Sequence, residues 1–168
     1  MTKRKYTTLQ RFGQKITSTR PGAWFFSKNL HYFDRVVLKL TKNRSTLTGI
    51  LSGIPVVILT CKGAKSGLAR SVPLLGILDE TGAGKVALIA SNWGQDHHPS
   101  WYYNLKANPD AQCSLKGQVQ EYKAHEAQGE EYARFWGEAT DTYMGFPHYK
   151  RWAGDRQIPI MVLAPVGK

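Results

Sequence analysis

Two adjacent histidines, His97 and His98, stand in the stretch "SNWGQDHHPSWYYNLKANPD" (residues 91–110), where imidazoles could bind a metal ion or transfer protons. Neighbouring residues point about 100° apart on a helix and to opposite faces of a strand, so the pair cannot easily chelate one ion. A zinc site would need a spacing such as HExxH, or a remote third ligand that the other histidines do not identify. We therefore predict no metal site and expect both side chains to face solvent or the rim of a pocket.

A second candidate for chemistry is the segment "CKGAKSGLAR" (residues 61–70), in which two glycines bracket Lys65 and Ser66 and Arg70 follows. A lysine, a hydroxyl and an arginine around a glycine-rich turn can bind a phosphate group. The Walker pattern is absent, because Ala64 replaces the glycine before the lysine and a strand is expected to follow. The segment is therefore either a phosphate-binding loop or a solvated hairpin turn.

The helix after the histidines offers further donors. Pro99 suits the first helical position because it has no N–H to leave unpaired, and Trp101 and Tyr102 then face inward until the helix stops near Asn108. A buried strand ending at Ser91, a glycine-containing loop and a helix N-terminus together present free backbone N–H groups. A polar or anionic ring system could bind there.

Short apolar runs separated by turn residues predict the elements that position these groups. Strands are expected at residues 54–61, 68–78, 85–91, 111–115, 118–124 and 158–165. A further helix is expected at residues 129–143, where apolar side chains recur at helical spacing. Strands outnumber crossover helices, which favours an α+β fold with a small antiparallel barrel and peripheral helices over a parallel sheet.

Composition bounds the class of protein. A chain of 168 residues suits one compact domain, and its two cysteines, Cys61 and Cys113, are expected to be reduced thiols of a cytosolic protein. The longest apolar runs fall far short of the roughly 20 residues of a membrane span, and no signal-peptide core is recognisable. We expect a cytoplasmic protein that is neither exported nor threaded through a membrane.

The net charge of +11 is concentrated at the N-terminus. Residues 1–44 carry eleven basic side chains against one acid, a net charge of +10, and include an amphipathic basic helix at residues 21–42. This helix either lies on an anionic membrane or docks on the sheet of the domain. We predict a basic N-terminal arm (residues 1–44) and a cofactor-binding domain (residues 45–168). Nucleic acid is an unlikely partner, because charge is present without a reading motif.

Four segments together resemble one known family: "LTCKGAKSGLARSVPL", "VALIASNWG", "HPSWYYNLKANP" and "DTYMGFPHYKRW…DRQIPIMV". Their combination at this spacing is similar to the deazaflavin-dependent nitroreductases, split-barrel reductases that use coenzyme F420, and extends over residues 57–164. The resemblance implies a split β-barrel. It also implies that the lysine loop holds the anionic part of the cofactor.

The same resemblance implies functional residues. The implied cofactor contacts are Lys65, Ser66, Arg70, Ser71, Val72, Pro73, Ala90, Ser91, Asn92, Ser100, Trp101, Tyr102, Tyr103 and Asn104. Tyr143, Tyr149 and Ser91 are the catalytic candidates, with the tyrosines as proton donors. Ala64, Asn92 and Phe146 depart from the family pattern, since arginine, lysine and tyrosine are frequent at these places.

The resemblance predicts a reductase that moves hydride from reduced F420 to a flat, electron-poor acceptor such as a quinone or a nitroaromatic compound. A related split barrel that uses flavin mononucleotide (FMN) is the alternative within enzymes. A non-catalytic module that binds an anionic membrane or a lipid is the alternative outside them. If the basic arm binds membrane, the protein would lie peripherally at its inner face.

Overall fold

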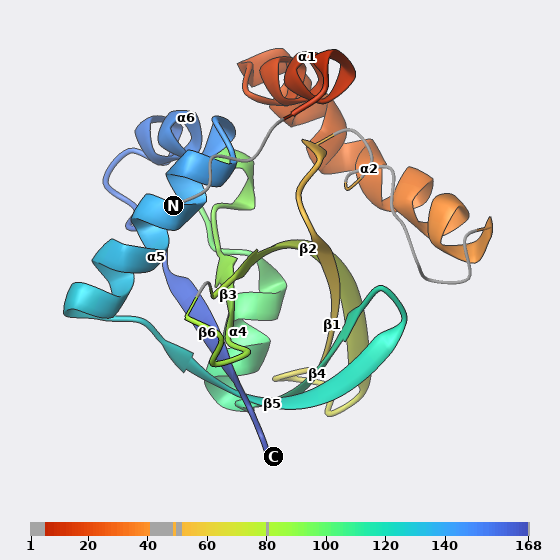
Figure 1. The fold of residues 1–168 in the computed structure, drawn as a ribbon, viewed down its shortest axis with the longest axis vertical. Coiled ribbons are helices and arrows are strands. Elements are labelled where there is room, and N and C mark those ends of the chain that lie inside the picture. The colour runs from red at the N-terminus through yellow and green to blue at the C-terminus, as the bar shows by residue number, and fades with distance from the viewer. Residues whose placement is uncertain (1–5, 41–48, 50–51, 80, 168) are drawn as a thin grey trace.

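The computed structural model describes residues 6–40, 49, 52–79 and 81–167, and within them six antiparallel strands close into a barrel (Figure 1). Its order is β1-β2-β3-β6-β5-β4. The strands are β1 (Val56–Lys62), β2 (Ala69–Leu78), β3 (Val86–Ile89), β4 (Asp110–Leu115), β5 (Gln118–Glu126) and β6 (Ile160–Pro165). The predicted α+β fold with an antiparallel barrel is confirmed, and each predicted strand has a counterpart whose ends differ by at most two residues.

Two adjacent strands, β3 and β6, are buried on both faces, which explains their unbroken apolar runs "VALI" and "IMVL". Leu88 and Leu163 face the barrel interior, whereas Ala87 and Val162 belong to a second core outside the barrel. By contrast, β5 buries only alternate residues near its end, because its outer face meets solvent. The barrel therefore has one covered side, and the helices that cover it include α5 and α6.

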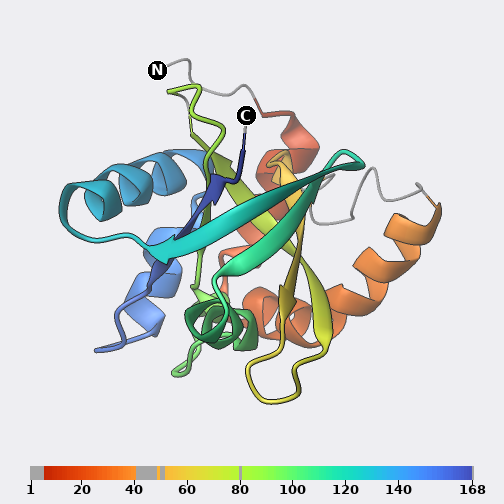
Figure 2. The same ribbon diagram turned by 90° about the horizontal axis from the view of Figure 1, so that it is seen from below.

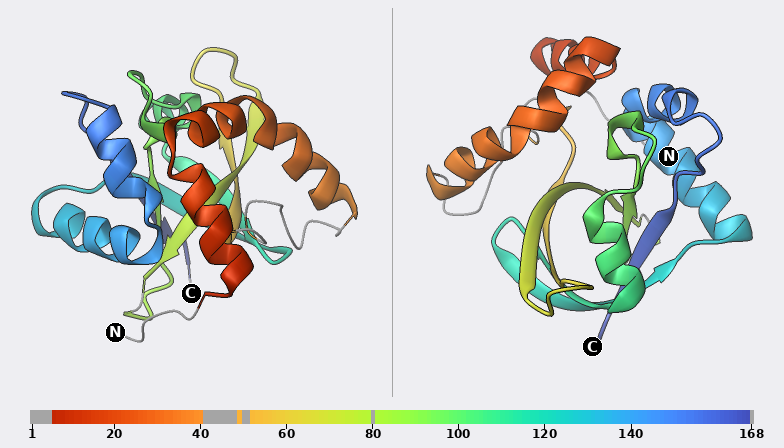
Figure 3. Two further views of the ribbon diagram at one scale, coloured as in Figure 1. Left: turned by 90° about the horizontal axis from the view of Figure 1, so that it is seen from above. Right: turned by 180° about the vertical axis from the view of Figure 1, so that it is seen from behind.

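The helices surround this barrel. They are α1 (Thr8–Thr17), α2 (Arg20–Leu40), the short η1 turn (Asn92–Gly94), α4 (Ser100–Ala107), α5 (Gly129–Thr142) and α6 (Gly145–Trp152). Figures 1 and 3 show α1, α2 and α6 on one side of the barrel, and α6 contacts both α1 and the η1 turn. Figure 2 shows α2 and α5 on opposite sides, with α4 between them. Helix α4 closes the interior core with Trp101 and Leu105.

Two helices, α1 and α6, were missed by the sequence patterns. The missed signal in α1 is a capping box, in which Thr7 and Gln10 satisfy each other's backbone N–H groups. In α6, Pro147 lies in the first turn, where a missing N–H costs nothing. The predicted place of Pro99 was also wrong by one residue: it is the extended N-cap of α4 (ψ 150°), not its first helical residue.

The predicted amphipathic helix at residues 21–42 corresponds to α2. Ala23 is buried in the outer core together with Ile54, so the first turns of α2 dock on the domain, while Phe25 is half exposed. The apolar positions further along this helix, Leu30, Phe33, Val36 and Leu40, have side chains outside the described residues. Within the part of the chain that the structure describes, no helix is both long and apolar enough to cross a membrane.

Candidate active site

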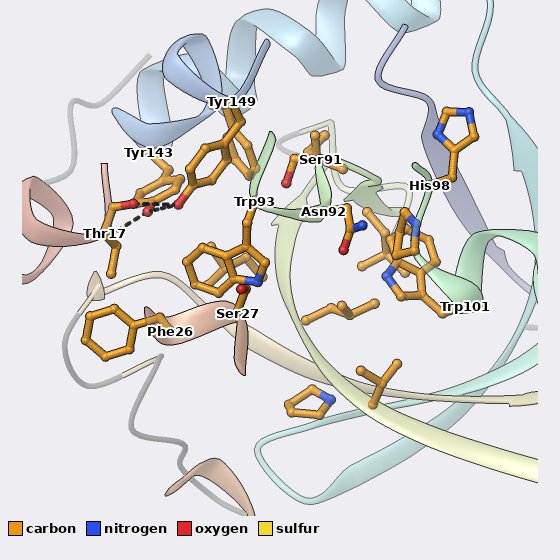
Figure 4. A pocket seen from close by; sticks show the side chains of 18 of the residues that line it. Thr17, Phe26, Ser27, Ser91, Asn92, Trp93, His98, Trp101, Tyr143 and Tyr149 are labelled. Atoms are coloured by element: carbon orange, nitrogen blue, oxygen red, sulfur yellow. Dashed lines mark hydrogen bonds between the residues drawn. The ribbon is translucent and has the colours of Figure 1, made fainter. Parts of the chain in front are cut away.

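A largely apolar cavity of about 640 Å³ lies between the barrel, the start of α4 and the group formed by α1, α2 and α6 (Figure 4). Its barrel wall comes from β2 and β3, and its other walls come from the η1 turn, α4 and the N-terminal helices. Nine predicted site residues line it: Val72, Pro73, Ser91, Asn92, Ser100, Trp101, Tyr103, Tyr143 and Tyr149. Segments far apart in the sequence thus meet at one site.

The lysine loop lies outside this cavity. Lys65 and Ser66 are exposed on the turn between β1 and β2, and Arg70 is exposed at the start of β2. The loop is nevertheless joined to α4, because the backbone N–H of Ala64 donates to Oδ1 of Asn104 at 3.0 Å. An exposed cationic loop and an apolar cavity are therefore connected through one amide side chain.

The remaining predicted contacts do not line the cavity. Ser71 pairs its hydroxyl with Thr60 at 2.8 Å on the barrel, and the side chain of Ala90 is fully buried in the interior core. Tyr102 turns away from the cavity, because its hydroxyl donates to Glu126 at 3.1 Å. Asn104 does not line the cavity either, but its side chain binds the lysine loop and so fixes that loop relative to α4.

Arg156, which sequence patterns did not single out, holds the wall between the barrel and α6. Its guanidinium donates to the carbonyls of Ala90 (3.2 Å), Ser91 (2.6 Å) and Gln95 (2.8 Å). Charge-assisted bonds from one planar group fix these carbonyls relative to one another. Burial lowers the pKa of Arg156 below its ordinary value. Arg156 lies in the segment "DRQIPIMV", but no sequence pattern predicts which carbonyl groups it binds.

His97 and His98 both line the cavity, in agreement with a position at the rim of a pocket, and their rings have different partners. Nδ1 of His97 lies 2.8 Å from the Asp96 carboxylate, while Nδ1 of His98 lies 3.0 Å from Nη1 of Arg156. Because a guanidinium can only donate, His98 accepts at Nδ1, which places its ring hydrogen on Nε2. Burial, followed by the positive charge of Arg156, lowers the pKa of His98. His98 is thus a neutral group of fixed tautomer.

Tyr143 and Tyr149 meet at the opposite wall (Figure 4), where their hydroxyl oxygens lie 2.9 Å apart. Tyr143 donates to the Thr17 hydroxyl (2.7 Å), and Tyr149 donates to the Thr17 carbonyl (2.9 Å). Burial raises the pKa of both tyrosines, that of Tyr149 well above its ordinary value, where the neighbouring Tyr143 adds to the effect. Both hydroxyls therefore keep their protons at neutral pH.

Several cavity residues were not predicted. Thr17, Phe26 and Ser27 come from α1 and α2, and Trp93 comes from the η1 turn. No local motif marks them, because they reach the cavity only when the N-terminal helices pack beside α6. Phe146 lies in the outer core, edge-on to Tyr143 with ring centroids 5.1 Å apart, and also reaches the cavity.

The sequence profile of the F420H(2)-dependent quinone reductases matches residues 34–165. The chain belongs to the F420H(2)-dependent quinone reductase family. A Mycobacterium tuberculosis protein, Rv3178, named for this activity, is 33% identical over 117 residues, which cover 70% of this chain and 95% of the relative. The F420H(2)-dependent quinone reductase Rv1261c of the same organism is 30% identical over 112 residues, covering 65% and 72%.

Two solved structures are similar to this chain, and the first is named for the same cofactor. An F420-H2 dependent reductase, FDR-A, is 38% identical with a TM-score of 0.59 and covers 65% of this chain and 93% of its own. A second structure, described as a domain-swapped dimer, is 32% identical with a TM-score of 0.61 and covers 85% and 98%. The F420H(2)-dependent quinone reductases are oxidoreductases, so the chain is assigned to an enzyme family with F420 as cofactor.

The residues of this F420H(2)-dependent quinone reductase family member fit such a cofactor. A flat ring needs apolar walls, which Val72, Pro73 and Trp101 provide, and an anionic tail needs exposed cations beside the ring pocket. Such cations are Lys65, on the loop that Asn104 joins to α4, and Arg70, at the start of β2. The structure thus has both an apolar pocket that suits the ring and exposed cations that suit the tail.

We predict a pH dependence of stability from His98. Its pKa is lowered on folding, so folding favours the neutral ring; this contribution is present above pH 6.5 and is lost as the pH falls through the folded pKa. Arg156 and His97 oppose the charged ring and Glu126 favours it. Urea unfolding above and below pH 6.5 measures this contribution. On acidification, the free energy of unfolding should fall less in His98→Gln than in the wild type. Equal pH dependence of the two proteins would contradict this role.

Proposed function

We propose that this chain transfers hydride from reduced F420 to a quinone, and that nitroaromatic compounds of similar shape also serve as acceptors. The observation that carries the proposal is the apolar cavity with a buried pair of protonated tyrosines on one wall and a cationic loop joined to the other. A flat acceptor can enter such a cavity, and a proton is available where the reduced acceptor needs one.

Lys65, Ser66 and Arg70 would hold the phosphate of the cofactor, with Val72 and Trp101 against its ring. When bound, reduced F420 supplies the hydride. The chain itself binds the anionic tail at its surface, orients the ring against the strand β2, and keeps water from the cavity. Asn104 fixes the lysine loop relative to the ring pocket through the Ala64 N–H.

Tyr143 would deliver the proton to the reduced acceptor from its Oη atom, and Tyr149 would replace it. In the structure both tyrosine hydroxyls donate to Thr17, so Tyr149 would turn its O–H from the Thr17 carbonyl toward Oη of Tyr143, 2.9 Å away, and would then regain a proton from water. Thr17 fixes both groups from α1. Ser91, whose carbonyl is held by Arg156, would contribute to the wall beside the reacting atoms.

Oxidation of reduced F420 by menadione tests the function directly. Parallel titrations with F420 and with FMN distinguish the proposed cofactor from the flavin alternative. Tight FMN binding with no F420 binding would contradict the proposal.

We predict that Lys65→Gln weakens F420 binding by about 1.5 to 3 kcal/mol, the range for a hydrogen bond to a charged group. Folding should be unaffected, because the lysine is exposed. The matched control is Lys116→Gln, which removes an exposed lysine from the β4–β5 turn at the other end of β1. Fluorescence titration that finds the same affinity in both variants would exclude the phosphate-binding role of Lys65.

We predict that Tyr143→Phe slows quinone reduction by about 10² to 10⁴-fold, the usual loss of a general acid. Tyr149→Phe should slow it less, because Tyr143 keeps its own proton. Since both pKa values are raised, the tyrosines should cause no decline of rate below about pH 10. Steady-state rates with menadione measure both effects, and an unchanged rate in Tyr143→Phe would transfer the proton delivery to Tyr149 or to water.

A membrane partner is favoured by one surface of the N-terminal helices. Leu9, Phe12 and Ile16 lie on one face of α1 and are exposed, as is Trp24 of α2, whose exposed fraction is 67%. Exposed cations lie among them at Arg11, Lys15, Arg20 and Lys28. An apolar face flanked by cations suits an anionic lipid surface, from which a quinone could reach the cavity.

We predict that the full chain binds anionic vesicles and is released by salt, since exposed charges are screened beyond about 8 Å at physiological ionic strength. Phe12→Ser should reduce the bound fraction in a vesicle sedimentation assay. Val119→Ser is the matched control, because Val119 is equally exposed on β5. Equal binding of both variants would remove α1 from the proposed membrane contact.

A further inference from the structure

Trp93 occupies a backbone conformation that bulky residues avoid. Its φ and ψ are 58° and 20°, and it stands between Asn92 (φ 47°) and Gly94 (φ 76°), so that three consecutive residues are left-handed. Such a conformation is strained in a non-glycine residue and persists only where the surroundings enforce it. A glycine would fit here without strain, yet the chain has a tryptophan.

The surroundings of the turn do enforce this conformation. Arg156 binds the carbonyls on both sides of it, at Ser91 and Gln95. At the far end of the turn, a Cβ on Gly94 would lie 3.0 Å from the backbone of Tyr149, so the turn is pressed against α6. The backbone of the turn is therefore held by Arg156 and by packing against α6, which fixes the point from which the Trp93 side chain projects.

The indole lies at the centre of the cavity wall. Its ring lies edge-on to Tyr149, with centroids 5.8 Å apart, and the turn that carries it contacts both α2 and α6. In Figure 4 the indole lies between the Tyr143–Tyr149 pair and Trp101. Trp93 is partly buried and lines the cavity, so part of its surface is open to an occupant.

We propose that Trp93 is a specificity-determining residue, whose indole stacks on the acceptor and selects two fused rings over a single ring. The inference rests on the proposed function and concerns the acceptor alone. A ring lying on the indole is brought beside the hydroxyls of Tyr143 and Tyr149, where the proton is delivered. A fused pair of rings overlaps the nine-atom indole more fully than a single ring does, and aromatic contact grows with that overlap.

The test compares menadione with benzoquinone in Trp93→Phe, Trp93→Leu and Trp93→Gly. Calorimetry on protein saturated with oxidised F420 measures menadione binding, and steady-state kinetics with reduced F420 give the ratio of kcat/KM values for the two quinones. We expect Trp93→Leu and Trp93→Gly to bind menadione roughly 3- to 10-fold more weakly, which is the loss of one aromatic contact. Their kcat/KM ratio should fall by a similar factor, while Trp93→Phe keeps most of both.

Lys116→Gly is the matched control, because it relieves a left-handed residue (φ 52°) in a turn outside the cavity. It should leave menadione binding and the kcat/KM ratio unchanged. If Trp93→Gly does not fold, the comparison of Trp93→Leu with Trp93→Phe decides. Equal menadione binding and equal ratios in those two variants overturn the inference. If the wild type oxidises no reduced F420 with either quinone, the proposed function fails, whereas calorimetric separation of the variants would still support the stacking role.

Discussion

The guanidinium of Arg156 connects the barrel to the helices that complete the cavity. It binds the two residues that follow β3, Ala90 and Ser91, and the residue after the left-handed turn, Gln95. A fourth acceptor on the same wall is Nδ1 of His98. Without this group, three carbonyls would lose a charged donor, and the turn that carries Trp93 would lose two of the contacts that hold its shape. The cavity geometry therefore depends on a residue that does not line it.

The opposite wall depends on the N-terminal helices. Thr17 accepts hydrogen bonds from both tyrosine hydroxyls, and Gln14 donates to the carbonyl of Ser52 at 2.7 Å. Thr17 and Gln14 precede residue 34, where the match to the family profile begins. The proposed cofactor contacts thus lie within the part of the chain that the profile matches, whereas the proposed acceptor side also uses a segment before it.

The departures from the family pattern have local structural roles. The backbone N–H of Ala64 binds Asn104, and the side-chain amide of Asn92 donates to the carbonyl of His97 at 2.9 Å. Neither position adds a cation, and Lys65 and Arg70 remain the cations that we propose for the anionic tail. Phe146 packs in the outer core against Tyr143, which leaves the buried tyrosines as the candidates for proton delivery.

The sequence by itself determined the strands, the barrel class and the lysine loop, because the pattern of apolar and turn residues is a local property that one strand or one turn carries alone. It determined the family through the combination of four motifs. It also placed Val72, Trp101, Tyr143 and Tyr149 at a common site, through a resemblance that covers all of them. It did not reveal α1 or α6, whose helical residues include glycine, threonine and proline and are stabilised by a capping box and by packing.

Only the tertiary structure decided which residues meet across the cavity. Thr17, Trp93 and Arg156 lie far apart in the sequence, and their partners are backbone carbonyls or rings on other elements. A backbone carbonyl is present at every residue, so no residue type marks the one that an arginine will bind. The left-handed conformation of Trp93 is likewise invisible in the sequence, because contacts with Arg156 and α6 impose it against the intrinsic preference of the residue.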